Sequence, residues 1–166
     1  MTKRVVLPGA QSAVTEEEAQ FLLDLAIEHG QGPILDLGTD WGFSALVLTQ
    51  SGQSVWTIDR GFLPETIRRL QKTEPPPVIV IGSFAAVLPR LRPGWGMAFL
   101  DGDHSLEATK ELAHQVLPLI RMGGVMAFHD YGRFGVKGAV DGLESAGVFK
   151  DFAESRLVGT VKAFWG

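Results

Sequence analysis

Five short apolar runs recur along the sequence, and they constrain its fold more than any other feature. The runs are Ile34–Leu37, Val55–Ile58, Val78–Ile81, Met97–Leu100 and Val125–Phe128. Each run is apolar almost throughout, which is typical of strands buried on both faces of a parallel sheet. Segments of helical length separate the runs, at about 43–50, 63–71, 84–91 and 106–120. This alternation predicts βαβ units and therefore an α/β, doubly wound, Rossmann-like sheet.

Further elements are predicted on both sides of this alternation. Thr15 and Glu18 have the spacing of a capping box and predict a first helix before the first run. A helix near 136–146 and a hairpin over 149–165 follow the fifth run. The closing antiparallel hairpin would complete a mostly parallel sheet of seven strands with helices on both faces. Residues 1–166 contain no repeat or long linker and are expected to form a single domain.

Composition and charge exclude several classes of partner. The net charge is −4 and the basic residues are scattered, whereas a nucleic-acid binder concentrates them in a patch. We therefore expect neither nucleic acid nor a membrane as a partner. No apolar stretch approaches the roughly 18 residues of a spanning helix, and the first residues lack a signal-peptide core, so a cytoplasmic protein is expected. The absence of cysteine excludes disulfides and thiolate chemistry.

The loop after the first run is the first candidate binding site. In open α/β sheets, ligands bind beyond the carboxyl ends of the strands. Gly38 permits a tight turn, and Gly42 lets a helix begin close to the strand. Asp40 stands where the dinucleotide fingerprint has its second glycine, which disfavours a pyrophosphate. Asp36 and Asp40 favour a cationic ligand instead; the alternative is a structural junction in which Asp40 caps the helix.

The second and third runs are followed by candidate residues for a nucleoside. Asp59 lies where an acidic side chain accepts both hydroxyls of a ribose, although a helix cap would also explain it. Ser83 and Phe84 form a small polar turn followed by an aromatic ring, which fits an adenine. Phe84 fits the hydrophobic core equally well.

Polar residues crowd together after the fourth and fifth runs, in the segments D-G-D-H-S at 101–105 and H-D-Y at 129–131. Carboxylates and imidazoles at neighbouring strand ends can ligate a divalent cation, and the predicted ligands are Asp101, His129 and Asp130. One such group can instead be a general base, for which the candidates are Asp103, His104 and His129. The alternative is that Asp103 and Ser105 cap a helix while His104 packs inside.

Three motifs in order resemble class I S-adenosylmethionine-dependent methyltransferases: I-L-D-L-G-T at 34–39, D-G-D-H-S at 101–105 and G-G-V-M-A-F-H-D-Y at 123–131. The sequence is most similar to small bacterial enzymes with a D-G-D-H-S segment, relatives of catechol-type and of macrolide and aminocoumarin sugar O-methyltransferases. The resemblance implies that S-adenosylmethionine is the cofactor and that a small molecule is methylated, at a hydroxyl oxygen. The implied contacts are Asp36, Gly38 and Thr39 to the amino-acid part, Asp59 to the ribose, and Ser83 with Phe84 to the adenine. Asp40, Gly42 and Asp101 complete the predicted cofactor-binding set.

The resemblance also bears on the metal and the base. Asp101 matches the first metal ligand of the catechol-type enzymes, whose other two ligands, an Asp-Asn pair, here read His129-Asp130. Magnesium, calcium or manganese is therefore expected with an altered ligand set. Asp103 matches a catalytic acidic residue of the sugar-methylating relatives. Little sequence follows Tyr131, so we expect a homo-oligomer to complete the substrate pocket, or residues 11–14 to cover the cofactor.

Two other functions remain open from the sequence. A non-catalytic binding domain would keep the ligand crevice without turning a substrate over. An NAD-dependent oxidoreductase would need a hydride-relay pair, for which Tyr131 and Lys137 are the available residues.

Overall fold

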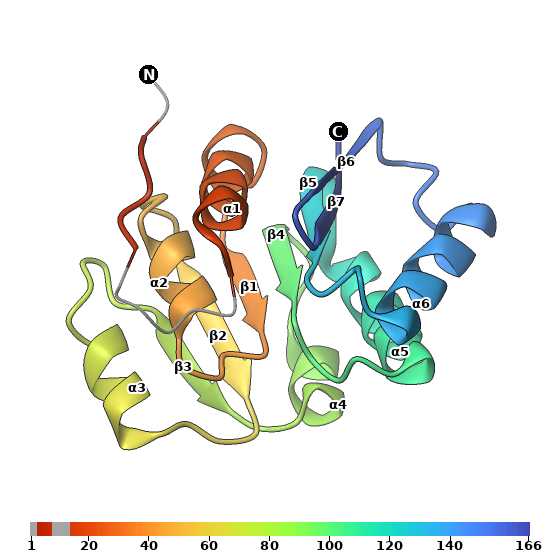
Figure 1. Ribbon diagram of the computed structural model, residues 1–166. Coiled ribbons are helices and arrows are strands. Elements are labelled where there is room, and N and C mark those ends of the chain that lie inside the picture. The colour runs from red at the N-terminus through yellow and green to blue at the C-terminus, as the bar shows by residue number, and fades with distance from the viewer. Residues whose placement is uncertain (1–2, 8–13) are drawn as a thin grey trace.

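A single central sheet organises the computed structural model, which describes residues 3–7 and 14–166 (Figure 1). The strands are β1 (Ile34–Leu37), β2 (Val55–Asp59), β3 (Val78–Ile81), β4 (Trp95–Leu100), β5 (Ile120–Phe128), β6 (Glu154–Val158) and β7 (Val161–Trp165). They form a seven-stranded sheet in the order β3-β2-β1-β4-β5-β7-β6. β1 to β5 are parallel, and β7 runs antiparallel to both β5 and β6. The predicted fold class is confirmed.

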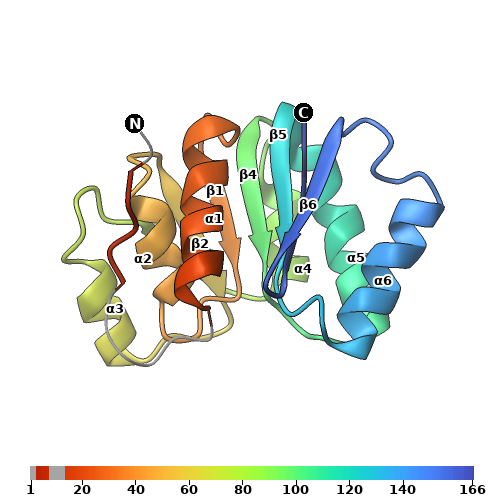
Figure 2. The same ribbon diagram turned by 45° about the horizontal axis from the view of Figure 1, so that its top comes forward.

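Helices cover both faces of the sheet (Figures 1 and 2). They are α1 (Glu16–Glu28), α2 (Phe43–Thr49), α3 (Pro64–Leu70), α4 (Phe84–Val87), α5 (Leu106–Val116) and α6 (Phe134–Ser145). α1, α2 and α3 pack on one face and α4, α5 and α6 on the other, with a separate hydrophobic cluster on each side. Within the described residues, no helix is both long and apolar enough to cross a membrane.

The capping box predicted for α1 is present and ties the helix to the final hairpin. The Thr15 hydroxyl accepts a hydrogen bond from the backbone N–H of Glu18, and the Glu18 carboxylate accepts one from the N–H of Thr15 at 2.8 Å. The same carboxylate accepts 2.5 and 2.7 Å bonds from the backbone and hydroxyl of Thr160. These hydrogen bonds outweigh burial and lower the pKa of Glu18. The start of α1 is thus fixed to the turn between β6 and β7.

Some predicted bounds were wrong, for tertiary reasons. The fifth apolar run predicted a strand from Val125, but β5 begins at Ile120 and includes Gly123 and Gly124. β3 was predicted to be buried on both faces; it is an edge strand, and Ile81 is 65% exposed. The segment predicted as one helix over 84–91 divides into the short α4 and a 3₁₀ turn at Leu88–Arg90, because Pro89 cannot supply a backbone N–H.

The strand order places a topological switch point between β1 and β4. From β1 the chain continues outward to β2 and β3, then crosses to the other side of β1 to form β4 and β5. The chain therefore leaves β1 and β4 in opposite directions, and such sheets bind ligands at the carboxyl ends of these two strands.

Candidate functional site

The loop after β1 is held in tight backbone contact with the loop after β4. Gly38 has φ +99°, and a β-carbon there would clash with the carbonyl oxygen of Asp101. The N–H of Asp101 donates a 2.8 Å hydrogen bond to the carbonyl of Leu37. Only glycine meets both requirements, the positive φ and the close approach. The glycine predicted to make a tight turn therefore sits at the switch point itself.

Four carboxylates surround this point: Asp36, Asp40, Asp59 and Asp101, here called the carboxylate cluster. Asp36 has no exposed surface, and its Oδ2 accepts a 2.6 Å hydrogen bond from the Thr57 hydroxyl. Its Oδ1 has no hydrogen-bond partner among the described residues. Burial raises the pKa of Asp36 to about 7 against the opposing hydrogen bonds from Thr57 and Ser44, and the charges of Asp101 and Asp59 raise it further. The negative charges of this cluster therefore repel one another.

Asp59 joins the loop after β1 to the end of β2. Its Oδ2 accepts hydrogen bonds from the backbone N–H groups of Thr39 at 2.9 Å and Asp40 at 3.2 Å. The alternative of Asp59 as a helix cap is not realised, since α3 begins after Leu63 without a side-chain cap. Asp40 does not cap α2 either; it adopts φ +43°, and burial together with Asp59 and Asp101 raises its pKa.

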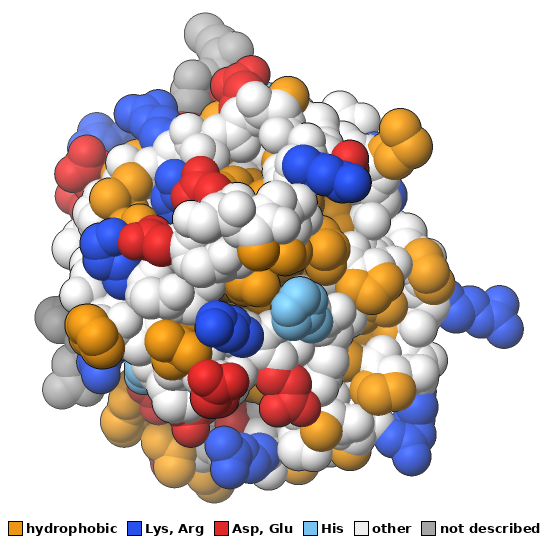
Figure 3. Space-filling view, turned by 90° about the vertical axis from the view of Figure 1, so that its right-hand side faces the viewer, with side chains coloured by type: hydrophobic (Ala, Val, Ile, Leu, Met, Phe, Trp, Pro, Cys, Tyr) orange, Lys and Arg blue, Asp and Glu red, His pale blue; other side chains and the backbone are white. Residues whose placement is uncertain are grey.

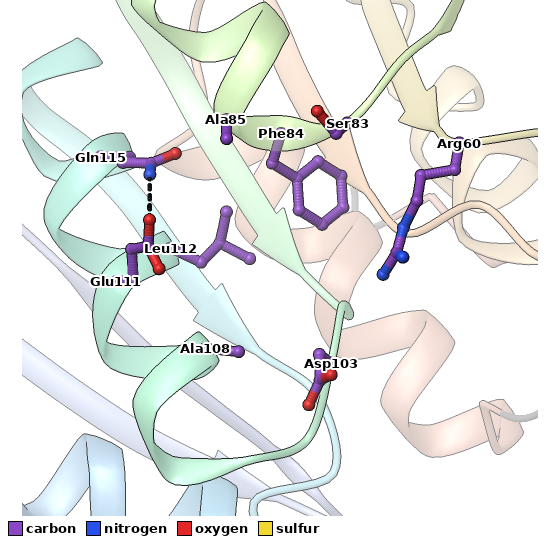
Figure 4. A pocket seen from close by; sticks show the side chains of 9 residues that line it. All are labelled: Arg60, Ser83, Phe84, Ala85, Asp103, Ala108, Glu111, Leu112 and Gln115. Carbon is purple, nitrogen blue, oxygen red and sulfur yellow. Dashed lines mark hydrogen bonds between the residues drawn. The ribbon is translucent and has the colours of Figure 1, made fainter.

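A hollow of about 280 Å³ opens beside the cluster and continues into a furrow of about 230 Å³ between α4 and α5 (Figure 4). Gly38, Asp59 and Asp101 line the hollow. Arg60, Phe84 and Asp103 line both spaces. The Phe84 ring faces the furrow between Arg60 and Leu112, and Ser83 lies at its rim (Figure 4). Ser83 also caps α4 by accepting a bond from the N–H of Ala86. Together the two spaces have the size of a nucleoside-containing ligand.

A second group, here called the histidine–aspartate cluster, consists of Asp101, His104, His129 and Asp130. Nε2 of His104 lies 2.9 Å from Oδ2 of Asp130 and 3.5 Å from Oδ1 of Asp101. Nδ1 of His129 lies 3.1 Å from the same oxygen of Asp101. One ligand atom each from Asp101, His104 and Asp130 lie within 4.8 Å of one another. The loops after β4 and β5 thus present their polar side chains to one place, as the strand ends predicted.

The two histidines differ in access. The His104 side chain is 35% exposed, whereas that of His129 is 3% exposed. Burial lowers the pKa of His129, but the carboxylates of Asp101, Asp130 and Glu18 outweigh burial and raise it. Nε2 of His129 has no hydrogen-bond partner among the described residues. His104 is therefore the more accessible of the two rings.

Asp130 is held in an unusual conformation by its neighbours. It has φ +54°, a left-handed backbone that costs a non-glycine residue on the order of 1–2 kcal/mol. Nε of Arg133 lies 3.0 Å from its Oδ2, opposite the contact from His104. Arg133 was missed from the sequence; its spacing of three residues from Asp130, before α6, was the only signal. Arg133 and His104 thus both contact the same carboxylate oxygen of this strained aspartate.

Asp103 and Ser105 form hydrogen bonds at the start of α5. Ser105 caps α5 by accepting a hydrogen bond from the N–H of Ala108, and Asp103 accepts a 2.8 Å bond from the N–H of Ser105. That bond lowers the pKa of Asp103. The capping alternative therefore holds for Ser105, while Asp103 still lines both spaces.

Of the remaining predicted positions, Gly42 lines neither the hollow nor the furrow, and residues 11–13 are not among the described residues. Gly42 begins α2 with φ +78° and packs against α3, where a β-carbon would meet Thr66 at 3.0 Å. Residues 11–13, predicted to cover the cofactor, lie outside the described residues; Val14 is buried.

The geometry can therefore accommodate a cationic, nucleoside-containing ligand beside the carboxylate cluster. It can also remove a proton from, or bind a metal beside, a second molecule at the histidine–aspartate cluster.

Comparison with known proteins points to one family. The profile of a family described as a methyltransferase domain matches residues 35–131, more than half of the chain. No curated protein matches the sequence. Among solved structures, a Klebsiella pneumoniae protein assigned as an O-methyltransferase has a TM-score of 0.71 and 19% identity, covering 96% of this chain and 83% of its own.

Two other similar structures contain bound ligands. The O-methyltransferase TomG of Streptomyces achromogenes, involved in tomaymycin synthesis and solved with S-adenosylmethionine, has a TM-score of 0.69 and 22% identity over 92% of this chain and 81% of its own. The methyltransferase PaMTH1 of Podospora anserina, solved with S-adenosylhomocysteine, has a TM-score of 0.66 and 16% identity over 89% and 77%. At these identities the likeness concerns the fold.

Proposed function

Because the chain belongs to this family of methyltransferase domains, we propose that it transfers a methyl group from S-adenosylmethionine to a hydroxyl oxygen of a small molecule. The carboxylate cluster beside the hollow carries the proposal. Burial and the surrounding charges raise the pKa values of Asp36 and Asp40, so a cation bound there would stabilise their ionised forms. S-adenosylmethionine brings a sulfonium and an ammonium group, whereas NAD brings an anionic pyrophosphate.

The residues present fit this donor. Asp36 contributes a buried carboxylate close to Asp59 and Asp101, and Gly38 and Thr39 belong to the loop proposed for the amino-acid part. Asp59 lines the hollow where a ribose would lie, and Ser83 and Phe84 border the furrow proposed for the adenine. When bound, the donor supplies a methyl group activated by its positively charged sulfur. The protein's task is then to hold donor and acceptor in line.

The acceptor hydroxyl must lose its proton as its oxygen takes up the methyl group, and we propose His104 as the base. Its ring is partly exposed, and Asp130 at 2.9 Å can stabilise the imidazolium that forms. Asp103 is a weaker candidate because its lowered pKa makes it less basic. His129 is a weaker candidate because its ring is almost fully buried; it is better placed to orient Asp101.

As the alternative to a base at His104, we propose that the histidine–aspartate cluster holds a divalent cation. Asp101, His104 and Asp130 offer two carboxylates and an imidazole within 4.8 Å of one another, a donor set that suits manganese better than calcium. This set replaces the His129 of the sequence prediction by His104, the more exposed ring. A bound cation would acidify a coordinated acceptor hydroxyl.

We propose a small-molecule acceptor and, because the basic residues are scattered along the sequence, neither nucleic acid nor a membrane as a partner. On the side of the molecule shown in Figure 3, basic and acidic side chains alternate with hydrophobic ones and no block of one sign stands out. We further propose that the whole chain acts as one domain in the cytoplasm, as expected from the sequence. In support of a single unit, one sheet includes strands from Ile34 to Trp165.

The oxidoreductase alternative has one observation in its favour and a stronger one against it. Lys137 Nζ does lie 3.5 Å from the Tyr131 hydroxyl. That hydroxyl, however, donates a 2.5 Å hydrogen bond to Asp141, which raises the pKa of Tyr131. A tyrosine that relays a proton to hydride chemistry needs a lowered pKa, so this trio is better explained as a brace between β5 and α6.

Calorimetric titration tests the proposed function. S-adenosylhomocysteine should bind with one-to-one stoichiometry and NAD should not. The substitution Asp59→Ala should weaken S-adenosylhomocysteine by roughly 1–3 kcal/mol, because it removes the partner of two backbone N–H groups and of the ribose. As a matched control, Asp151→Ala changes an exposed aspartate near β6 and should leave the affinity unchanged. Tight binding of NAD without binding of S-adenosylhomocysteine would refute the proposal.

A further inference from the structure

β6 forms one edge of the sheet. It is last in the strand order and, among the described residues, pairs with β7 alone (Figure 2). The residues from Glu154 to Leu157 are exposed, with Leu157 at 47%. Unpaired backbone groups along such an edge are a template for another strand.

The turn fixes which backbone groups face outward. Gly159 and Thr160 form a two-residue turn, so Val158 and Val161 are the first pair of the hairpin. The pair beside such a turn exchanges backbone hydrogen bonds, and hydrogen-bonded pairs alternate along an antiparallel ladder. The backbone groups of Leu157 and Ser155 therefore face the open edge.

The charges on β6 are opposite in sign and two positions apart. Glu154 and Arg156 lie on the same face of the strand, the face of α1, where the Arg156 guanidinium stands 5.6 Å from the Phe21 ring. Neither Glu154 nor Arg156 has an ion-pair partner among the described residues. A groove of about 560 Å³ between α1 and β6, lined by Glu17 and Asp24 among others, borders this face.

We propose that β6 pairs antiparallel with β6 of a second copy of this chain, about a two-fold axis at Ser155. In this register the outward backbone groups of Ser155 meet those of the partner's Ser155. Glu154 lies opposite the partner's Arg156, and symmetry repeats this pair on the other side of the axis. The charged pair takes the non-hydrogen-bonded position, where opposite side chains are closest.

Other pairings of the same edge are less favourable. An axis at Arg156 would place two arginines opposite each other in the non-hydrogen-bonded position, where opposite side chains are closest. An axis at Leu157 would leave Glu154 and Arg156 opposite uncharged residues. The pattern Glu-Ser-Arg therefore encodes one register of self-pairing, which joins two sheets into a continuous one. Glu154, Ser155 and Arg156 line neither the hollow nor the furrow, so the pairing is independent of the proposed catalysis.

Sedimentation velocity over a micromolar concentration series tests this pairing. The wild-type chain should form a dimer, and Arg156→Glu should raise its Kd at least about tenfold, because both charge pairs become repulsive. The exchanged variant Glu154→Arg with Arg156→Glu should restore the dimer. Lys72→Glu, a charge reversal at the opposite edge of the sheet, should leave the Kd unchanged, and circular dichroism checks that each variant is folded.

Three results would each overturn the inference. The first is a wild-type chain that stays monomeric at the highest concentration. The second is an Arg156→Glu variant that dimerises as tightly as the wild type, and the third is an exchanged variant that does not recover the dimer.

Discussion

At the residue scale, the buried carboxyl of Asp36 links the charge of the site to the stability of the fold. Its pKa is raised to about 7, while the unfolded chain should titrate near 3.9. The folded state therefore binds the proton more tightly, and the stabilisation present below about pH 4 is lost as the pH rises to about 7. The slope for this group is up to about 1.4 kcal/mol per pH unit.

The expected result is a difference between two pH profiles. Urea unfolding from pH 4.5 to 7.5 should show the wild type losing stability with rising pH relative to Asp36→Asn, which cannot ionise. Above pH 7 the two profiles should run parallel. Parallel profiles over the whole range would contradict the raised pKa.

A second residue-scale prediction concerns the switch-point glycine. Gly38→Ala should destabilise the protein by more than about 2 kcal/mol, because the new methyl group meets the Asp101 carbonyl as well as the strain of a positive φ. Gly52 also has a positive φ, but a β-carbon there meets nothing within 4 Å. Gly52→Ala should therefore cost only the backbone strain, about 1 kcal/mol. Equal losses in urea unfolding would argue against the steric contact.

The sequence predicted which residues reach the site better than what each contacts there. Asp59 and Asp101 follow apolar runs, and the parallel sheet alone brings such positions to one edge. The division of roles between His104 and His129 depends on side-chain rotamers and on the left-handed turn at Asp130, which no spacing specifies. Arg133 was missed for the same reason, since its ion pair requires that turn.

At the scale of elements, the serine caps place two helix starts beside the site. Ser105 caps the eleven-residue α5 and Ser83 the four-residue α4, each through a 3.3 Å hydrogen bond. Ser105→Ala should lower the free energy of unfolding by about 1 kcal/mol. Ser83→Ala should lower it less, because a single turn contributes little helix to lose. Thermal unfolding distinguishes the two, and a larger loss for Ser83→Ala would contradict this account.

The apolar runs predicted the bounds of some strands but not their burial or their full length. β1 and β3 begin and end where their apolar runs do. The exposure of β3 could not be predicted, because a strand's place at the edge depends on strand order rather than on its own residues. β5 extends through Gly123 and Gly124 because pairing with β4 resumes at Ile120 opposite Trp95, on the far side of a register shift. The apolar run alone could not predict this extension, because it depends on pairing with a distant strand.

At the scale of the whole molecule, the sheet brings together charged and polar side chains from loops that are distant in sequence. Asp101 and His104 follow β4, whereas His129 and Asp130 follow β5, so only the assembled sheet forms the histidine–aspartate cluster. A cation held there would link the two loops and would bind the folded chain alone. Metal binding should consequently appear as stability of the entire domain.

Manganese should therefore raise the Tm of the wild-type protein. At about 100 times its Kd, a ligand of the folded state adds about 2.7 kcal/mol, or roughly 5–10 °C for a chain of this size. His104→Ala should remove most of this shift, because it deletes one of the three converging ligands. His114→Ala, on the exposed surface of α5, should leave it intact, and an anomalous difference map from manganese-soaked crystals should place the ion between Asp101 and Asp130.

If His104→Ala keeps the full shift, His104 is not a ligand. If the wild type shows no shift and a chelator leaves methyl transfer unchanged, the cluster acts without metal. His104 then remains as the base, and His104→Ala should lower kcat without changing the affinity for S-adenosylhomocysteine.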